Sequence, residues 1–224
     1  MRLLIFLIYK RSQNHVMTFL ACVLLLAAAL VNGQTPPSSW IPLFDGHSLK
    51  GWNQTLFSKH GATTVKDGVI HIAKSSLTGI TWAGRDFPKS GYEIRFEAAR
   101  LDGNDFFAGI TFPVKDSYCT WINGGWGGST IGLSSLDHND ASENDTSITR
   151  DFVNGRWYAF RLAVTDTRIQ GWIDGELIID VDITKRLVSL RPGEMDLSTP
   201  LGFATYWTEA GLRKIEYRRL AVAK

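Results

Sequence analysis

Two-residue turns between strand-sized runs of residues constrain the fold of this chain more than any other feature. Asp67-Gly68, Asn154-Gly155 and Asp174-Gly175 each separate two such runs. Asn, Asp and Gly adopt the positive φ angles that two-residue hairpin turns need, so each pair predicts an antiparallel β-hairpin. The expected paired strands are 64–66 with 69–72, 149–153 with 156–165, and 169–173 with 176–181.

The rest of the chain after Gln34 has the same character, because no stretch keeps a helical periodicity over three turns. Strand 92–98 alternates between apolar side chains, which are expected to face the core, and the charged Glu93, Arg95 and Glu97 on its other face. Further strands are predicted at 41–44, 80–83, 106–112, 118–122, 130–134, 201–206 and 212–220. About a dozen strands without an intervening helix predict antiparallel sheets packed face to face.

The first 33 residues are predicted to be an export signal, not part of the folded domain. They contain no acid, place Lys10 and Arg11 before an apolar run that ends at Val31, and finish in small residues at Gly33. An uncleaved anchor is the alternative, but the run is shorter than the ~20 residues that span a membrane. We therefore expect a signal peptide at 1–33, a linker at 34–39 and one domain at 40–224, exported to the periplasm or the extracellular space.

The mature chain is close to neutral. Cleavage removes Arg2, Lys10 and Arg11, so the 24 basic residues fall to 21 against 22 acids. This balance predicts no nucleic-acid partner and no membrane partner after the signal is cleaved. Cys119 is then the one cysteine left, which rules out a disulfide within the mature chain. We expect it to be a small buried hydrophobic residue and not a catalytic thiol.

Four segments, in order, carry a resemblance to a known family. Residues 43–52 are L-F-D-G-H-S-L-K-G-W, 65–70 are V-K-D-G-V-I, 200–204 are P-L-G-F-A, and 212–218 are L-R-K-I-E-Y-R. The chain resembles the 3-keto-disaccharide hydrolase domain family over its whole mature length, most specifically in the opening F-D-G-x-x-L-x-G-W. The resemblance implies an all-β, concanavalin A-like jelly-roll β-sandwich of two antiparallel sheets, with a concave face that receives a carbohydrate or glycoside ligand.

The activity that this resemblance implies is cleavage of glycosides whose sugar is oxidised at carbon 3. The ketone acidifies the proton on C2, a base removes that proton, the C1 substituent leaves by elimination, and water adds to the product. Such a site needs a base with a pKa near neutral and donors that stabilise an enolate.

This chain departs from the family at two polar segments. A Gln-Asp-His-like run of the family is replaced by A-T-Y-W-T-E at 204–209, and a Tyr-Glu-Val-Gln-like strand by Y-C-T-W at 118–121. Fold transfers between relatives more securely than activity. A non-catalytic carbohydrate-binding module therefore remains an alternative to the enzyme, and a structural sandwich without a sugar ligand is a third.

Residues 121–130 are the first candidate part of a sugar site. The segment holds Trp121, Trp126 and four glycines that lie on both sides of Trp126, and an indole face suits the C–H face of a pyranose. Asn123 both donates and accepts hydrogen bonds. The alternative is that one Trp belongs to the core and the glycines only turn the chain. The predicted substrate-binding residues are Trp121, Asn123, Trp126, Arg150 and Tyr206.

The polar loop 137–146 is the second candidate part. His138 is the predicted base, because histidine is the residue type best suited to that role near pH 7, while Asp137 and Glu143 are predicted to orient it or share its proton. Arg150 follows this loop and is placed either to clamp a substrate oxygen or to form a salt bridge back to the loop. The alternative for the loop itself is an ordinary solvated connection.

Two other kinds of site are disfavoured, and no metal or cofactor is expected. Glu93 and Glu97 lie roughly 13 Å apart on a strand at ~3.3 Å per residue, beyond the ~5–9.5 Å of paired glycosidase carboxylates. A salt-linked strand face is expected there instead. A calcium loop that starts at Asp137 lacks its glycine and its final acid, because Ser142 and Ile148 occupy those positions.

The two candidate segments, 121–130 and 137–146, are expected to meet on one concave face, because strands joined by a short connection are usually neighbours. His138 within hydrogen-bond reach of an acid in a pocket would favour the enzyme. A stacked Trp without such a contact would favour the binding module.

Overall fold

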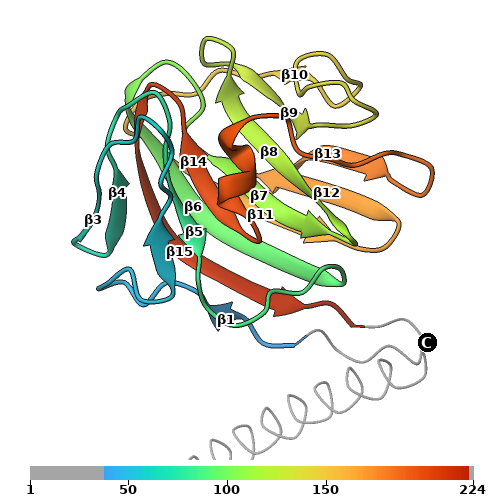
Figure 1. Ribbon diagram of the computed structural model, residues 1–224, viewed down its shortest axis with the longest axis horizontal. Coiled ribbons are helices and arrows are strands. Elements are labelled where there is room, and N and C mark those ends of the chain that lie inside the picture. Colours follow the sequence, from blue (N-terminus) through green and yellow to red (C-terminus); the bar gives the residue numbers. More distant parts are fainter. Residues whose placement is uncertain (1–37, 222–224) are drawn as a thin grey trace, which may run out of the picture. The chain divides into compact units, whose positions relative to one another are not determined.

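The computed structural model describes residues 38–221, in which Ser39–Arg219 form one compact unit (Figure 1). A second unit combines Met1–Ser38 with Leu220–Lys224 and lies almost wholly outside the described residues. The predicted export signal at 1–33 and its cleavage site are therefore outside them too. No helix within 38–221 has the length and apolar character needed to cross a membrane.

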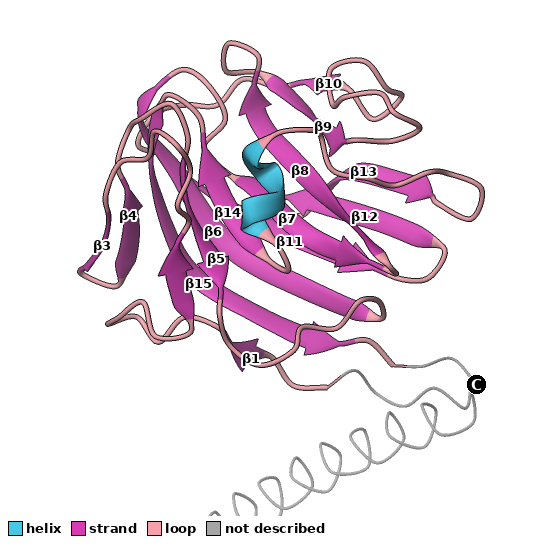
Figure 2. Cartoon of the chain, viewed as in Figure 1, coloured by secondary structure: helices cyan, strands magenta, loops and turns pink. Residues whose placement is uncertain are grey.

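The unit consists of two antiparallel sheets packed face to face, as the sequence predicts (Figures 1 and 2). The eight-stranded sheet has the order β13-β12-β11-β6-β15-β4-β3, with β1 paired to β15. Its strands are β1 (Ile41–Pro42), β3 (Thr63–Lys66), β4 (Val69–Ile72), β6 (Tyr92–Gly103), β11 (Trp157–Val164), β12 (Arg168–Ile173), β13 (Glu176–Asp182) and β15 (Thr208–Arg219).

The seven-stranded sheet has the order β10-β9-β8-β7-β14-β5-β2. Its strands are β2 (Trp52–Gln54), β5 (Thr78–Trp82), β7 (Gly109–Val114), β8 (Ser117–Gly125), β9 (Thr130–Ser134), β10 (Ile148–Thr149) and β14 (Gly202–Thr205). A single 3₁₀ turn within 38–221, η1 (Glu194–Ser198), precedes β14. The predicted class, an all-β jelly-roll sandwich, is confirmed.

The core lies between the sheets and is built by strand alternation. Tyr92, Ile94, Phe96 and Ala98 of β6 all point inward and are buried, as predicted. The Phe96 ring stacks on Phe160 of its own sheet at 4.9 Å and meets Phe203 of the opposite sheet edge-on at 4.8 Å. Burying such a side chain stabilises the fold by about 1.5–3 kcal/mol, which is how the sandwich holds together.

Cys119 of β8 belongs to this core, in agreement with the expectation of a buried hydrophobic residue. Burial raises the pKa of its thiol to about 12. The thiolate needed for nucleophilic chemistry is therefore absent near neutral pH.

Two of the three predicted hairpins are confirmed. β3 pairs with β4 across Asp67-Gly68, and β12 pairs with β13 across Asp174-Gly175. The prediction of a hairpin at Asn154-Gly155 is wrong. The strand before this turn, β10, lies in the seven-stranded sheet, whereas the strand after it, β11, lies in the eight-stranded sheet. Arg100 of β6 holds this turn instead: its Nε donates to Asn154 Oδ1 at 2.6 Å, and its carbonyl accepts from Gly155 N at 2.7 Å.

The outer face of the eight-stranded sheet is the salt-linked face that the alternation in 92–98 predicts. Glu93 accepts from Arg161 at 2.7 Å and from Arg218, and Glu97 accepts from Arg213 at 2.7 Å. Two of these guanidinium groups also cover tryptophan rings, with Arg161 3.5 Å from the centroid of Trp172 and Arg213 3.9 Å from that of Trp157. The charges of this face are thus paired with one another, as the prediction of a salt-linked face requires.

Candidate active site on the seven-stranded sheet

The outer face of the seven-stranded sheet carries short side chains. In β8 the alternation turns Cys119 and Trp121 toward the core and leaves Thr120 and Ile122 on the outer face. In β9 the neighbouring outward residue is Ser134. This face therefore has room for other segments to lie directly on it.

Two glycines let two segments sit against this face. A Cβ on Gly202 would lie 2.6 Å from the carbonyl oxygen of Ser198, so η1 packs on β14 (Figure 2). A Cβ on Gly132 would lie 2.5 Å from the carbonyl oxygen of Ala141, so the 137–146 loop packs on β9. β8 and the pocket described next lie between these two covered areas.

The pocket encloses about 380 Å³ and has Thr120, Ile122 and Ser134 at its base. This volume falls in the usual range of small-molecule sites, about 300–1,000 Å³. Its walls bring together three acids, one arginine and three aromatic rings, which come from segments far apart in the sequence: Asp105, Asp140, Glu194, Arg191, Phe106, Trp126 and Tyr206.

Asp140 and Arg191 form the charged centre of the pocket. Arg191 Nη1 donates to Asp140 Oδ2 at 2.8 Å. The other carboxylate oxygen, Oδ1, accepts from the backbone N–H of Ala141 at 2.8 Å and from the hydroxyl of Ser134. The Asp140 side chain is 15% exposed and that of Arg191 58%. The acid is thus fixed from three sides, while the arginine is free to turn toward a ligand.

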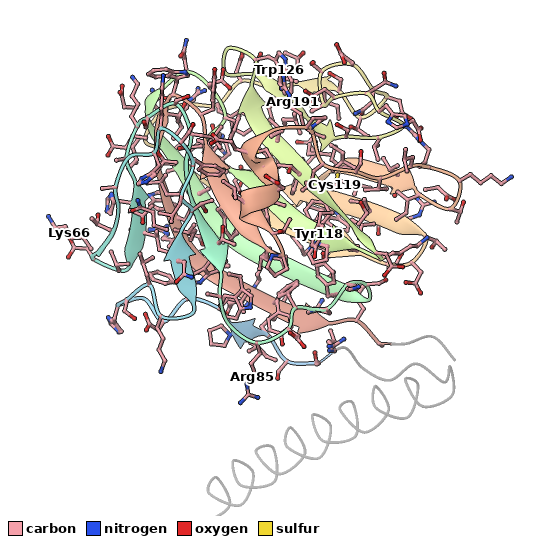
Figure 3. All side chains as sticks on the ribbon, viewed as in Figure 1. Lys66, Arg85, Tyr118, Cys119, Trp126 and Arg191 are labelled. Atoms are coloured by element: carbon pink, nitrogen blue, oxygen red, sulfur yellow. The ribbon has the colours of Figure 1, made fainter. Side chains whose placement is uncertain are left out.

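Arg191 also connects this charged centre to an aromatic ring. Its guanidinium carbon lies 5.9 Å from the centroid of Trp126, and the two side chains are neighbours in Figure 3. Trp126 is 44% exposed and has a φ of 50°. A bulky residue rarely adopts positive φ, and the conformation costs about 1–3 kcal/mol, so the local structure holds the indole at the pocket against this strain.

The two remaining acids brace the pocket. Asp105 accepts from the backbone N–H of Phe106 at 2.8 Å and from that of Gly127 at 3.2 Å, which ties the Trp126 turn to the segment before β7. Glu194 accepts from the backbone N–H of Ser58 at 2.7 Å and from its hydroxyl at 3.2 Å. A carboxylate has about four lone-pair sites, so each acid retains capacity for a ligand.

The structure corrects the predicted roles of Trp121 and Asn123. Trp121 is 0% exposed, packs on Phe160 at 5.9 Å and reaches across the core to Gly171 of β12. Asn123 is also buried and donates from Nδ2 to the carbonyl oxygen of Ala108 at 3.0 Å. Strand alternation turns both side chains to the interior, so neither one contacts a sugar on the outer face.

Trp126 and Tyr206, in contrast, do line the pocket. Arg150 does not: it pairs with Glu176 at 3.2 Å and with Asp174 at 3.9 Å. These partners belong to the opposite sheet's β12–β13 hairpin, so the salt bridge back to the 137–146 loop is not formed either.

The predicted catalytic group His138, Asp137 and Glu143 lies on the exposed part of the 137–146 loop and does not line the pocket. The Asp137 carboxylate accepts hydrogen bonds from Leu187 N at 2.8 Å and from the guanidinium of Arg186. These hydrogen bonds lower the pKa of the Asp137 carboxyl. Within 38–221, no hydrogen bond or ion pair joins His138 to an acid. The geometry therefore gives no support to a His138-centred site.

Asp140 is the residue through which the 137–146 loop reaches the pocket. The loop was a candidate from its sequence, yet nothing in its composition separates Asp140 from its acidic neighbours. Arg191 and Glu194 come from the connection between β13 and β14, and Asp105 precedes β7. No local sequence signal marks these three residues.

The two packed antiparallel sheets define the class of the protein, a jelly-roll β-sandwich with a pocket on the outer face of one sheet. Among the solved structures that share this fold are the following three. A mutant of the family GH16 endo-β-1,3(4)-glucanase SCLam has a TM-score of 0.57 at 14% identity, over 84% of this chain and 99% of that one. The Crh5 transglycosylase in complex with NAG gives 0.55 at 12%, over 85% and 89%. The carbohydrate-binding module CBM66 from Bacillus subtilis gives 0.50 at 12%, over 74% and 93%.

Residues 39–218 match the model of the 3-keto-alpha-glucoside-1,2-lyase-like domain, and the chain belongs to this family. The resemblance predicted from the F-D-G-x-x-L-x-G-W opening is thereby confirmed. A sequence search of curated proteins finds no match.

Proposed function

We propose that the pocket binds a glycoside whose sugar carries a ketone at carbon 3, and that it cleaves this glycoside by base-assisted elimination followed by hydration. The supporting observation is the Asp140–Arg191 ion pair beside the exposed face of Trp126, in a chain of the 3-keto-α-glucoside-1,2-lyase-like family. Asp140 takes the role of base for which the sequence suggested His138.

The chemistry assigns one task to each of these groups. Trp126 stacks on the C–H face of the pyranose. A guanidinium has five N–H donors, so Arg191 donates one hydrogen bond to the C3 carbonyl oxygen and holds Asp140 Oδ2 beside the same sugar ring. Oδ2 removes the proton from C2, and the electron pair moves onto the carbonyl oxygen, where the guanidinium stabilises the enolate.

Elimination and hydration then complete the cleavage. As the enolate returns to the ketone, a C1–C2 double bond forms and the bond from C1 to the glycosidic oxygen breaks. The leaving oxygen takes up the proton that Asp140 removed from C2, which restores the carboxylate. Water adds to C1 and a proton returns to C2, so the products are the 3-keto sugar and the free aglycone.

Non-catalytic carbohydrate binding is the second candidate, and two observations favour it. Asp105, Asp140 and Glu194 each already accept hydrogen bonds from the protein itself. Trp126 is exposed at the pocket, while among residues 38–221 no acid forms a hydrogen bond or ion pair with His138. A binding module needs the aromatic face and the polar groups but no free base.

The test is to incubate the purified domain with a set of glucosides and with their 3-keto derivatives, and to follow release of the aglycone by chromatography. The proposal predicts release from the 3-keto derivatives alone, and its loss in Trp126→Ala. Binding measured by calorimetry without any release would establish the second candidate. Neither binding nor release would contradict both.

We further propose that the protein is exported. The basic start, apolar middle and small-residue end of residues 1–33 support this proposal. Secreted material whose N-terminal sequence begins near Gln34 would bear it out. Material that begins at Met1 or Met17 would contradict it and favour the anchor.

A further inference from the structure

An aromatic surface continues from the pocket at the end of β14, where Tyr206 and Trp207 follow Thr205. Tyr206 N donates to the carbonyl oxygen of Phe106 at 3.1 Å, and Trp207 N donates to that of Ser75 at 2.7 Å. The backbone of both residues is therefore fixed by segments on its two sides. Their side chains remain exposed, Tyr206 at 37% and Trp207 at 51%.

The rings of these residues form a continuous surface that leads out of the pocket. Phe106 and Tyr206 both line the pocket and stack on each other, with centroids 5.9 Å apart and planes 17° apart. Trp207 is beyond the lining and meets Tyr206 at 6.3 Å with an interplanar angle of 81°. The two exposed rings thus stand at nearly a right angle and form an aromatic corner beside the pocket.

The exposed position of Trp207 is fixed by its backbone. Its φ is 48°, a conformation that a bulky residue adopts only when its surroundings enforce it. Trp126, on the Arg191 side of the pocket, has the same kind of backbone at a φ of 50°. Exposed apolar rings that neighbouring bonds hold in strained backbone are typical of ligand-binding positions.

We propose that Tyr206 and Trp207 form a subsite for the aglycone, the group that leaves from C1 when the glycoside in the pocket is cleaved. This inference rests on the proposed function, since it assumes that the sugar ring occupies the pocket beside Trp126. It names the substrate class: a glycoside whose aglycone is a ring with a flat apolar face, either a second pyranose or an aromatic ring. Small alkyl glycosides fill the pocket and leave this corner empty.

The test compares equilibrium binding of three unoxidised glucosides, which lack the ketone and are therefore not cleaved: methyl glucoside, a glucose disaccharide and phenyl glucoside. Calorimetry on Trp207→Ala is expected to show affinity for the two ring-bearing ligands reduced about tenfold, as loss of one aromatic contact implies, and affinity for methyl glucoside unchanged. Trp207→Gly relaxes the positive φ and is expected to give the same selective loss. Trp172→Ala, on the opposite sheet, is the matched tryptophan control and should leave all three affinities unchanged.

The outcomes separate the subsite from the function of the pocket. Equal weakening of all three ligands in Trp207→Ala, or no weakening of any, would overturn the subsite while the pocket function stands. Failure of the wild-type protein to bind any of the three would overturn the subsite too, whereas the proposed function is decided separately by release of aglycone from the 3-keto derivatives. Given the selective loss, tighter binding of phenyl glucoside identifies an aromatic aglycone, and tighter binding of the disaccharide identifies a sugar.

Discussion

Replacing Gly132 by alanine is expected to push the 137–146 loop away from the seven-stranded sheet and thereby disturb the pocket. Gly132 lies in β9, and a Cβ there would be 2.5 Å from the carbonyl oxygen of Ala141 and 3.1 Å from its Cα. All the close atoms belong to backbone, so no side chain can rotate out of the way. Ordinary contact begins near 3.4 Å, so the loop must retreat by about 0.9 Å.

The size of the effect follows from this displacement. Overpacking of a well-packed site costs about 1–3 kcal/mol of unfolding free energy. At the midpoint of that range and about 2–4 °C per kcal/mol for a domain of this size, Tm should fall by about 6 °C. Asp140 directly precedes Ala141, so its bonds to Ser134 and Arg191 are disturbed as well. A misplacement of about 1 Å in a catalytic group lowers turnover by about 10²-fold.

Scanning calorimetry and the aglycone-release assay measure both effects. Gly109→Ala, in β7 of the same sheet, is the control for stability alone, because its Cβ would meet the pocket-lining ring of Phe106 at 3.1 Å and the carbonyl oxygen of Ala204 at 3.2 Å. These contacts are much less close than the 2.5 Å at Gly132, so the Tm loss of Gly109→Ala should be less than half as large. If Gly132→Ala melted within about 1 °C of the wild type with unchanged kcat/KM, the close packing of the loop on β9 would be refuted.

Three further predictions follow from individual residues. His138→Ala should leave kcat/KM unchanged, because the side chain lies outside the pocket; a loss of about 10²-fold or more would restore it as the base. Hydrogen bonds from the backbone N–H of His47 and from the hydroxyl and N–H of Ser48 lower the pKa of Asp45 from 3.8 to about 2, so its stabilising contribution is complete above pH 4 and lost as pH falls toward 2. Urea unfolding of Asp45→Ala should lack this acid-side slope, and an unchanged slope would contradict the assignment. Cys119 should react with a thiol reagent only after unfolding, and reductant should leave Tm unchanged.

Features set by neighbouring residues were predictable from the sequence. The turns at Asp67-Gly68 and Asp174-Gly175 require positive φ at two positions, and the residues present there supply it. The alternation in 92–98 likewise identifies both its core face and its salt-linked face. At Asn154-Gly155 the turn itself was also correct, but its partner is Arg100, far away in the sequence. Local sequence does not say which sheet each flanking strand joins.

The site was less predictable, because it depends on orientation and on long-range contacts. Both faces of strand 118–122 carry apolar side chains, so composition does not tell that Trp121 points inward while Ile122 faces the pocket. Arg191 lies about fifty residues after Asp140 in the chain. The two residues meet because of how the sheets fold, and local sequence does not indicate such a long-range contact. His138 was chosen because of its residue type, whereas the fold places Asp140, two residues further along, in the pocket.

The most direct test of the account is the rate of aglycone release by Asp140→Asn from a 3-keto glucoside. Asparagine keeps the size of the side chain and the acceptor for Ala141 N–H, but it is not a base. Asp145→Asn is the matched control, because Asp145 lies in the same loop and pairs with Arg186 at 2.9 Å, away from the pocket. The account predicts that Asp140→Asn lowers kcat by about 10²–10⁴-fold and that Asp145→Asn retains wild-type turnover. Wild-type turnover by a folded Asp140→Asn protein would contradict the assignment of the base and of the pocket.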